Sequence, residues 1–73
     1  MENKVIEIIS KITKIPAENL KEKSNEKNIW DSLRHMEIII ALEDEFDITF
    51  ENEDIADAKT INLIIETVRS KAK

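Results

Sequence analysis

The sequence of 73 residues contains no cysteine, no glycine and only one histidine. Without cysteine there is neither a disulfide nor a thiolate metal site, and one histidine cannot form a cluster of ligands, so we expect no metal centre. Without glycine, turns that need a positive φ angle are rare and β-hairpins are disfavoured. A chain this short builds one small core with a net stability of roughly 3–5 kcal/mol. We therefore expect a single domain over residues 1–73, too small for a closed substrate pocket, and no enzyme activity.

Long apolar runs are also missing. No stretch of 18 or more apolar residues occurs, so no segment is expected to span a membrane. The first residues, MENKVIEIISKITK, lack the charged, then apolar, then small-residue pattern of a signal peptide. Together with the lack of cysteine, this favours a cytoplasmic protein.

Charge is distributed very unevenly along the chain, whose formal net charge is −5. Residues 1–35 sum to +1, residues 36–58 carry nine Asp or Glu and no Lys or Arg, and residues 59–73 sum to +3. The acidic block argues against binding to nucleic acid, whose phosphates it would repel. Two interpretations stay open: a solvated acidic face that keeps the protein soluble, or a docking surface for a basic protein partner.

Apolar residues recur with helical spacing, and alternating strand patterns are scarce, which predicts an all-α chain. The first helix is expected from about Asn3 to Lys14, before Pro16, which cannot continue a helix. Its apolar stripe consists of Val5, Ile8, Ile9 and Ile12. Residues 17–30 are mostly polar and predict a long connection, in which Leu20 and Ile29 anchor the chain to the core.

Three further helices are predicted after this connection. One begins at Asp31, a good N-cap residue, and runs to Phe46 or Asp47. A helix of one to two turns follows near residues 52–57, and Thr60 is expected to cap the last helix. The last helix places four apolar residues on one face: Ile61, Ile64, Ile65 and Val68.

The helix that begins near Asp31 is apolar on two sides. With a rotation of about 100° per residue from Leu33, one stripe falls between about 140° and 240° and is expected to face the core. This stripe consists of Ile38, Ile39, Leu42 and Phe46. The opposite side holds Leu33, Met36 and Ile40 together with the carboxylates of Glu37 and Asp44. An exposed apolar strip rimmed by charge is typical of a protein contact, although Met36 and Ile40 could instead fill gaps beneath the 17–30 connection.

Ser32 falls in the first turn of this helix, where free backbone N–H groups and the helix dipole favour an attached anion such as phosphate. A serine that merely starts a helix has the same position. A hydrolytic triad of Asp31, Ser32 and His35 is rejected, because Asp31 is used as a cap and His35 falls on the core side. There is also no room for an oxyanion hole beside a substrate pocket. We expect His35 to be partly buried and to touch Trp30 or the neighbouring loop.

The segment WDSLRHMEIIIALEDEF, residues 30–46, resembles the recognition helix of acyl and peptidyl carrier proteins. The resemblance rests on Asp31-Ser32-Leu33, Glu37, Ala41-Leu42-Glu43 and Glu45-Phe46. The FDITF segment, a short acidic helix and Thr60-Ile61 keep the spacing of this family into the last helix, so the resemblance covers nearly the whole chain. It implies a four-helix bundle with a short third helix.

The resemblance also implies that the protein is a carrier. Ser32 would bear 4′-phosphopantetheine, added from coenzyme A by a phosphopantetheinyl transferase, with Asp31 and Leu33 beside it. The thiol of this arm would hold an acyl or aminoacyl cargo as a thioester. Positions that match the partner contacts of the family are Leu33, Met36, Glu37, Ile40, Glu43 and Asp44. The implied partners are the transferase and the enzymes that load or transfer the cargo through basic docking surfaces, with the carrier itself a monomer.

Two departures from the family pattern bear on the cargo. Carriers of fatty acid synthesis usually have glycine and a small residue before Asp-Ser-Leu and an acidic residue after it, whereas this chain has Ile29-Trp30 before it and Arg34 after it. The changed charge beside the attachment point favours a specialised carrier, for example of a modified sugar, an amino acid or a dedicated acyl product. The alternative is a helical adaptor without any covalent group, which docks a basic partner through the acidic apolar helix face.

Overall fold

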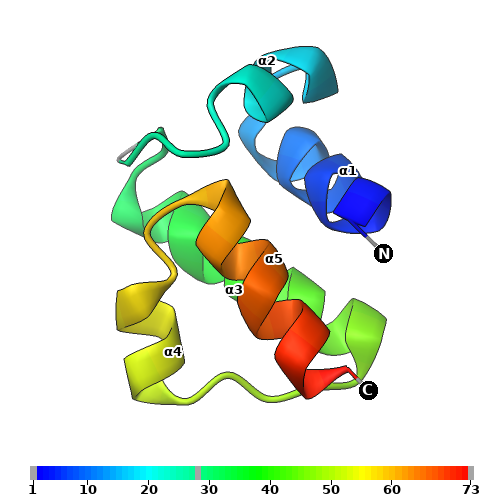
Figure 1. Cartoon of the computed structure of the whole chain (residues 1–73), viewed down its shortest axis with the longest axis vertical. Coiled ribbons are helices and arrows are strands. Elements are labelled where there is room, and N and C mark those ends of the chain that lie inside the picture. Colours follow the sequence, from blue (N-terminus) through cyan, green and yellow to red (C-terminus); the bar gives the residue numbers. More distant parts are fainter. Residues whose placement is uncertain (1, 28, 73) are drawn as a thin grey trace.

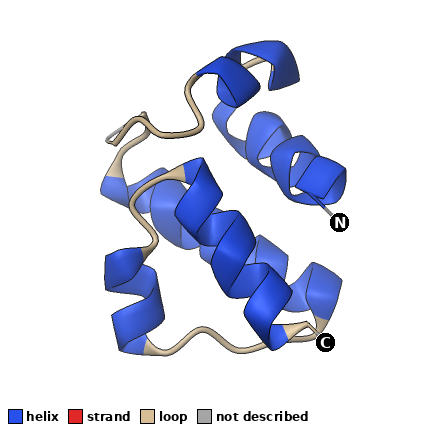
Figure 2. Cartoon of the chain, viewed as in Figure 1, coloured by secondary structure: helices blue, strands red, loops and turns tan. Residues whose placement is uncertain are grey.

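A computed structural model describes residues 2–27 and 29–72, and these residues form an all-α fold without strands, as the sequence predicts (Figures 1 and 2). Its described helices are α1 (Glu2–Thr13), α2 (Ala17–Glu22), α3 (Ser32–Phe46), α4 (Asn52–Asp57) and α5 (Ile61–Lys71). α1 packs against α2, α3 and α5. Within the described part of the chain, no helix has both the length and the apolar character needed to cross a membrane.

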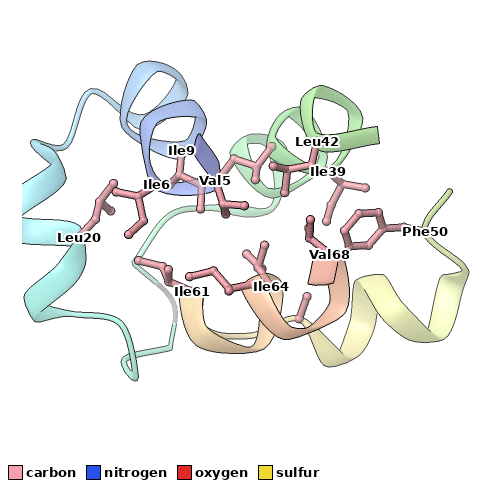
Figure 3. Packing of buried hydrophobic residues seen from close by; sticks show 13 residues of the cluster. Val5, Ile6, Ile9, Leu20, Ile39, Leu42, Phe50, Ile61, Ile64 and Val68 are labelled. Atoms are coloured by element: carbon pink, nitrogen blue, oxygen red, sulfur yellow. The ribbon is translucent and has the colours of Figure 1, made fainter. Parts of the chain in front are cut away.

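α2 is the main difference from the sequence prediction, in which residues 17–30 form one long connection. Residues 17–22 are helical, and Pro16 stands before them with an extended backbone. Leu20 of α2 is fully buried and lies toward Ile6 of α1 (Figure 3). A helix this short depends on tertiary packing more than on its own propensity, so the polar segment AENLKE gives little periodic signal. The expected four-helix arrangement therefore has an additional short helix after α1.

The apolar stripe of α1 is only partly as predicted. Val5 and Ile9 are fully buried, whereas Ile8 and Ile12 are half-buried. Ile6, outside the predicted stripe, is only 7% exposed. The reason is the unexpected α2, which packs against α1 and covers the side of the helix that carries Ile6.

The predicted core faces of α3 and α5 are confirmed, and both contribute to one core with α1 (Figure 3). Their buried residues are Ile38, Ile39, Leu42, Ile61, Ile64, Ile65 and Val68. Phe46, at the end of the α3 stripe, and the predicted anchor Ile29 are partly buried against this core. Phe50 and Ala58, which flank α4, also belong to it. Full burial of an aliphatic side chain of this size contributes roughly 1.5–3 kcal/mol, so these residues account for most of the stabilisation.

Both predicted N-caps of the long helices are confirmed. Asp31 Oδ1 accepts a hydrogen bond from the backbone N–H of Arg34 at 2.8 Å, and Thr60 caps α5 in the same way at 3.2 Å. α3 ends at Phe46, and Asp47 follows in the left-handed conformation with φ 54°. Aspartate visits this conformation more readily than most residues, which explains how a chain without glycine turns at this point.

α4 is positioned by apolar and polar contacts together: none of its residues is fully buried, but Ile55 packs against the core and the flanking Phe50 and Ala58 are buried in it. Asp54 pairs with Lys71 of α5 at 2.8 Å, and its carboxylate also accepts from the backbone N–H of Glu51 at 2.9 Å. On the side toward α3, Nε2 of His35 lies 3.2 Å from the carbonyl oxygen of Ile55. These contacts fix α4 beside the N-terminal part of α3.

The Asp54–Lys71 pair should make the stability of the protein depend on pH. The hydrogen bond from Lys71, with that from Glu51, lowers the pKa of Asp54 below its ordinary value of 3.8. A carboxyl group whose pKa is lowered by folding stabilises the native state fully at a pH above its pKa in the unfolded chain. This contribution is lost as the pH falls through its pKa in the folded protein. Asp54→Asn should therefore lower the melting temperature at neutral pH, and the difference from the wild type should vanish well below pH 4.

Thermal unfolding followed by circular dichroism across the acidic range measures this effect. Lys71→Met is the matched control, because it removes the other half of the same pair and should show the same dependence on pH. A deficit of Asp54→Asn that stays constant down to the lowest pH would contradict a role of the ionised carboxylate.

Candidate functional site

Ser32 is the first residue of α3, and its side chain is exposed. The N–H of Arg34 donates to the Asp31 side chain, and the N–H of His35 donates to the Asp31 carbonyl oxygen at 3.0 Å. The N–H groups before them, in the first turn of a 15-residue helix, have no intrahelical acceptor. A negative group on the Ser32 Oγ would therefore lie where these donors and the helix dipole favour it.

His35 joins three separate parts of the chain beside Ser32. The Nε1–H group of Trp30 donates to His35 Nδ1 at 3.0 Å, and the two rings stack with centroids 6.3 Å apart. Because Nδ1 accepts, the neutral ring carries its proton on Nε2, which donates to the Ile55 carbonyl oxygen at 3.2 Å. The predicted contact with Trp30 is confirmed. Both ring nitrogens have partners, so the geometry agrees with the rejection of His35 as a base for Ser32.

A pocket of about 580 Å³ opens next to Ser32, between the loop before α3, the first turns of α3, and α4. Trp30, His35 and Met36 line it from the α3 side, and Ile55 and Ala56 line it from α4. Lys27 and Lys59 also contribute to its wall. The sequence gives no signal for this pocket, because its shape depends on where the short α4 comes to lie.

The second apolar stripe of α3 is exposed, as expected for a contact surface. Leu33 is 67% exposed, Ile40 60% and Met36 43%. The alternative, that Met36 and Ile40 fill gaps beneath the 17–30 connection, is therefore wrong. Glu37 and Asp44 are exposed as well. We call these five residues the docking face.

Two charged residues modify this face. Arg34 Nη1 lies 2.7 Å from Glu37 Oε1, and this hydrogen bond raises the pKa of the already basic Arg34 guanidinium. One carboxylate of the docking face is thus paired within the protein. Glu43 differs from the other predicted partner residues, because it is half-buried and accepts from the backbone N–H of Phe50 at 2.7 Å. It fixes the segment that follows α3.

Comparisons with known proteins agree with this arrangement. Residues 30–68 match the family described as "Phosphopantetheine attachment site". The chain is 35% identical over 75 residues to an acyl carrier protein of Buchnera aphidicola, an alignment that covers all of this chain and 95% of that protein. It is also 35% identical over 65 residues to an acyl carrier protein of an Exiguobacterium species, with coverage of 88% and 82%. The family match begins at Trp30 and includes α3, α4 and most of α5.

Proposed function

Since this chain belongs to the acyl carrier protein family, whose covalently attached cofactor is 4′-phosphopantetheine, we propose that Ser32 is its attachment point. We further propose that the protein works as a monomer and delivers an acyl or aminoacyl cargo within a specialised pathway. When bound, the cofactor supplies the thiol that holds cargo as a thioester, which the chain itself lacks because it has no cysteine.

The exposed hydroxyl of Ser32 at the start of α3 is the observation that carries this proposal. In the transfer, Oγ loses its proton and forms a bond to the β-phosphorus of coenzyme A, and 3′,5′-bisphosphoadenosine leaves with the electrons of the broken P–O bond. The product is a phosphodiester at a helix N-terminus, an environment that favours a negative charge. The neighbouring pocket and its two lysines fit a polar, anionic arm.

The docking face supports transient binding of several enzymes at this site. Its apolar residues can be buried in a partner, and its carboxylates can steer a basic surface toward Ser32. Moderate affinity suits a carrier that must leave each enzyme again. A flexible arm then raises the effective concentration of the cargo at the docked enzyme.

The surroundings of Ser32 support a specialised pathway rather than bulk fatty acid synthesis. Trp30 occupies the loop two residues before Ser32, and Arg34 places a positive charge two residues after it. This charge is paired with Glu37. An enzyme whose basic surface binds a free carboxylate at each of positions 34 and 37 would therefore find a neutral ion pair instead. Ordinary rates of loading and extension by fatty acid synthase enzymes would overturn this part of the proposal.

Intact-mass measurement tests the attachment. Purified apo-protein is incubated with coenzyme A, Mg²⁺ and a phosphopantetheinyl transferase of broad specificity. The wild type should gain one phosphopantetheine, and Ser32→Ala should gain none. Ser70→Ala is the matched control, since Ser70 is an exposed serine outside the site, and it should be modified like the wild type. A folded, unmodified wild type that gains no mass would favour the adaptor that binds partners without a covalent group.

A further inference from the structure

The two ring nitrogens of His35 have opposite hydrogen-bonding roles beside Ser32. Nδ1 accepts from the indole N–H of Trp30 at 3.0 Å, and Nε2 lies 3.2 Å from the carbonyl oxygen of Ile55. An indole N–H group can only donate, and a carbonyl oxygen can only accept. Both bonds therefore require the neutral form of the imidazole that has its proton on Nε2.

Protonation of His35 removes the acceptor that Trp30 needs. Both nitrogens of a charged imidazole carry a proton, so no rotation of the ring in place gives Trp30 an acceptor. Attraction between the charged ring and the face of the indole does not replace the lost bond. The ring centroids lie 6.3 Å apart, outside the range of about 6 Å for such an attraction. The bond to Ile55 is kept, because Nε2 still donates, so protonation acts on Trp30 and leaves α4 in place.

The charges that face this ring come from three segments. Lys27 and Asp31 in the loop before α3 and Lys59 after α4 line the same pocket as the ring, whereas α4 itself contributes only uncharged side chains to this wall. Within α3, the guanidinium of Arg34 is already paired with Glu37. Two ammonium groups face one carboxylate, so no net negative charge at the pocket offsets the loss of the bond to the indole.

Loss of this bond affects the segment that leads into α3. Trp30 directly precedes Asp31, the N-cap of α3, and lies two residues before Ser32. Trp30 and Ile29 pack against the core as partly buried side chains, so the segment stays near its position when the bond is broken. What changes is how often the segment opens. The loss of one hydrogen bond raises the population of the open form about two- to tenfold.

We propose that the Trp30–His35 pair makes the segment before Ser32 sensitive to pH. Neutral His35 holds Trp30 in place, and protonated His35 allows this segment to open more often. An imidazole ordinarily gains its proton between about pH 8 and pH 5, so the change is expected in this range. The pair thereby controls the order of one wall of the pocket and of the entry into α3. This property does not depend on whether Ser32 carries a group.

The indole N–H of Trp30 reports on the pair directly. Trp30 is the only tryptophan of the chain, so the indole gives a single signal in a nitrogen-resolved NMR spectrum. His35→Gln is the matched variant, because glutamine accepts with Oε1, donates with Nε2 and does not titrate. Comparison at the same pH cancels the intrinsic effect of pH on hydrogen exchange.

At pH 8, the indole proton should exchange with water at similar rates in the wild type and in His35→Gln. At pH 5.5, exchange should be about two- to tenfold faster in the wild type than in the variant. A ratio of the two rates that is the same at both pH values would overturn the proposal.

Trp30→Phe is a second variant that keeps the proposal testable when His35→Gln does not fold. It removes the indole donor but keeps an aromatic ring that can pack against the core. At pH 8, the backbone amides of residues 29–31 should exchange about two- to tenfold faster than in the wild type. At pH 5.5 the rates should become equal, because the wild type has then lost the same bond. An excess of exchange in Trp30→Phe that stays unchanged at pH 5.5 would contradict the proposal.

Discussion

Replacing Leu42 with alanine should remove most or all of the free energy of unfolding of this protein. Leu42 has no exposed surface and belongs to the face of α3 that lies in the core shared with α1 and α5 (Figure 3). Truncation of a buried leucine to alanine costs about 2–5 kcal/mol, and a domain of this size has a net stability of only roughly 3–5 kcal/mol. Urea unfolding followed by circular dichroism should therefore show a transition at very low urea or none at all.

Leu33→Ala is the matched control, because it makes the same change in the same helix at a side chain that is 67% exposed. Its free energy of unfolding should stay within about 0.5 kcal/mol of the wild type. If Leu42→Ala unfolded at the urea concentration of the wild type, Leu42 would not lie at the centre of the core. If both variants lost stability equally, Leu33 could not belong to an exposed face.

The long helices could be predicted from the sequence because the residues that determine them, the apolar stripe and the capping residue, lie close together in the chain. Period and capping residues placed both ends of α3 and the start of α5 within one residue, and they identified Leu42 and Ile64 as core residues. Asp31 and Thr60 cap their helices through bonds that span only three residues. Exposure of the second α3 stripe follows from the same period, because one helix cannot bury two opposite faces in a core this small.

The parts that could not be predicted depend on residues far apart in the chain. α2 has one fully buried residue, Leu20, and its packing explains why Ile6 is covered. The acceptor for His35 is a backbone carbonyl 20 residues later. Every residue has such a carbonyl, so the sequence pattern cannot identify which one accepts. Glu43 was expected to contact partners, but a bond to the N–H of Phe50 uses one of its oxygens. Each of these features needs the position of a short helix or a connection, which composition does not fix.

Truncating two residues of the docking face should disable recognition by partner enzymes without unfolding the protein. Leu33 and Ile40 are 67% and 60% exposed, so their loss leaves the core unchanged. Apolar anchors at the centre of an interface typically contribute about 1–2 kcal/mol each when truncated. The double variant Leu33→Ala with Ile40→Ala should therefore reduce kcat/KM of the transferase about 100-fold at saturating coenzyme A.

The controls for this prediction separate docking from folding and from the acceptor itself. Leu63→Ala removes a similar side chain from α5, where it is 40% exposed but outside the docking face, and it should leave kcat/KM unchanged. The double variant should keep the melting temperature of the wild type and should still become fully modified in a long incubation, because Ser32 is intact. The docking face also carries carboxylates, so the rate with the wild type should fall as ionic strength rises. The double variant keeps these carboxylates and should therefore show the same salt dependence. A rate of the double variant equal to that of the wild type would place the partner contact elsewhere on the molecule, and the acidic apolar side of α3 would then act only as a solvated face.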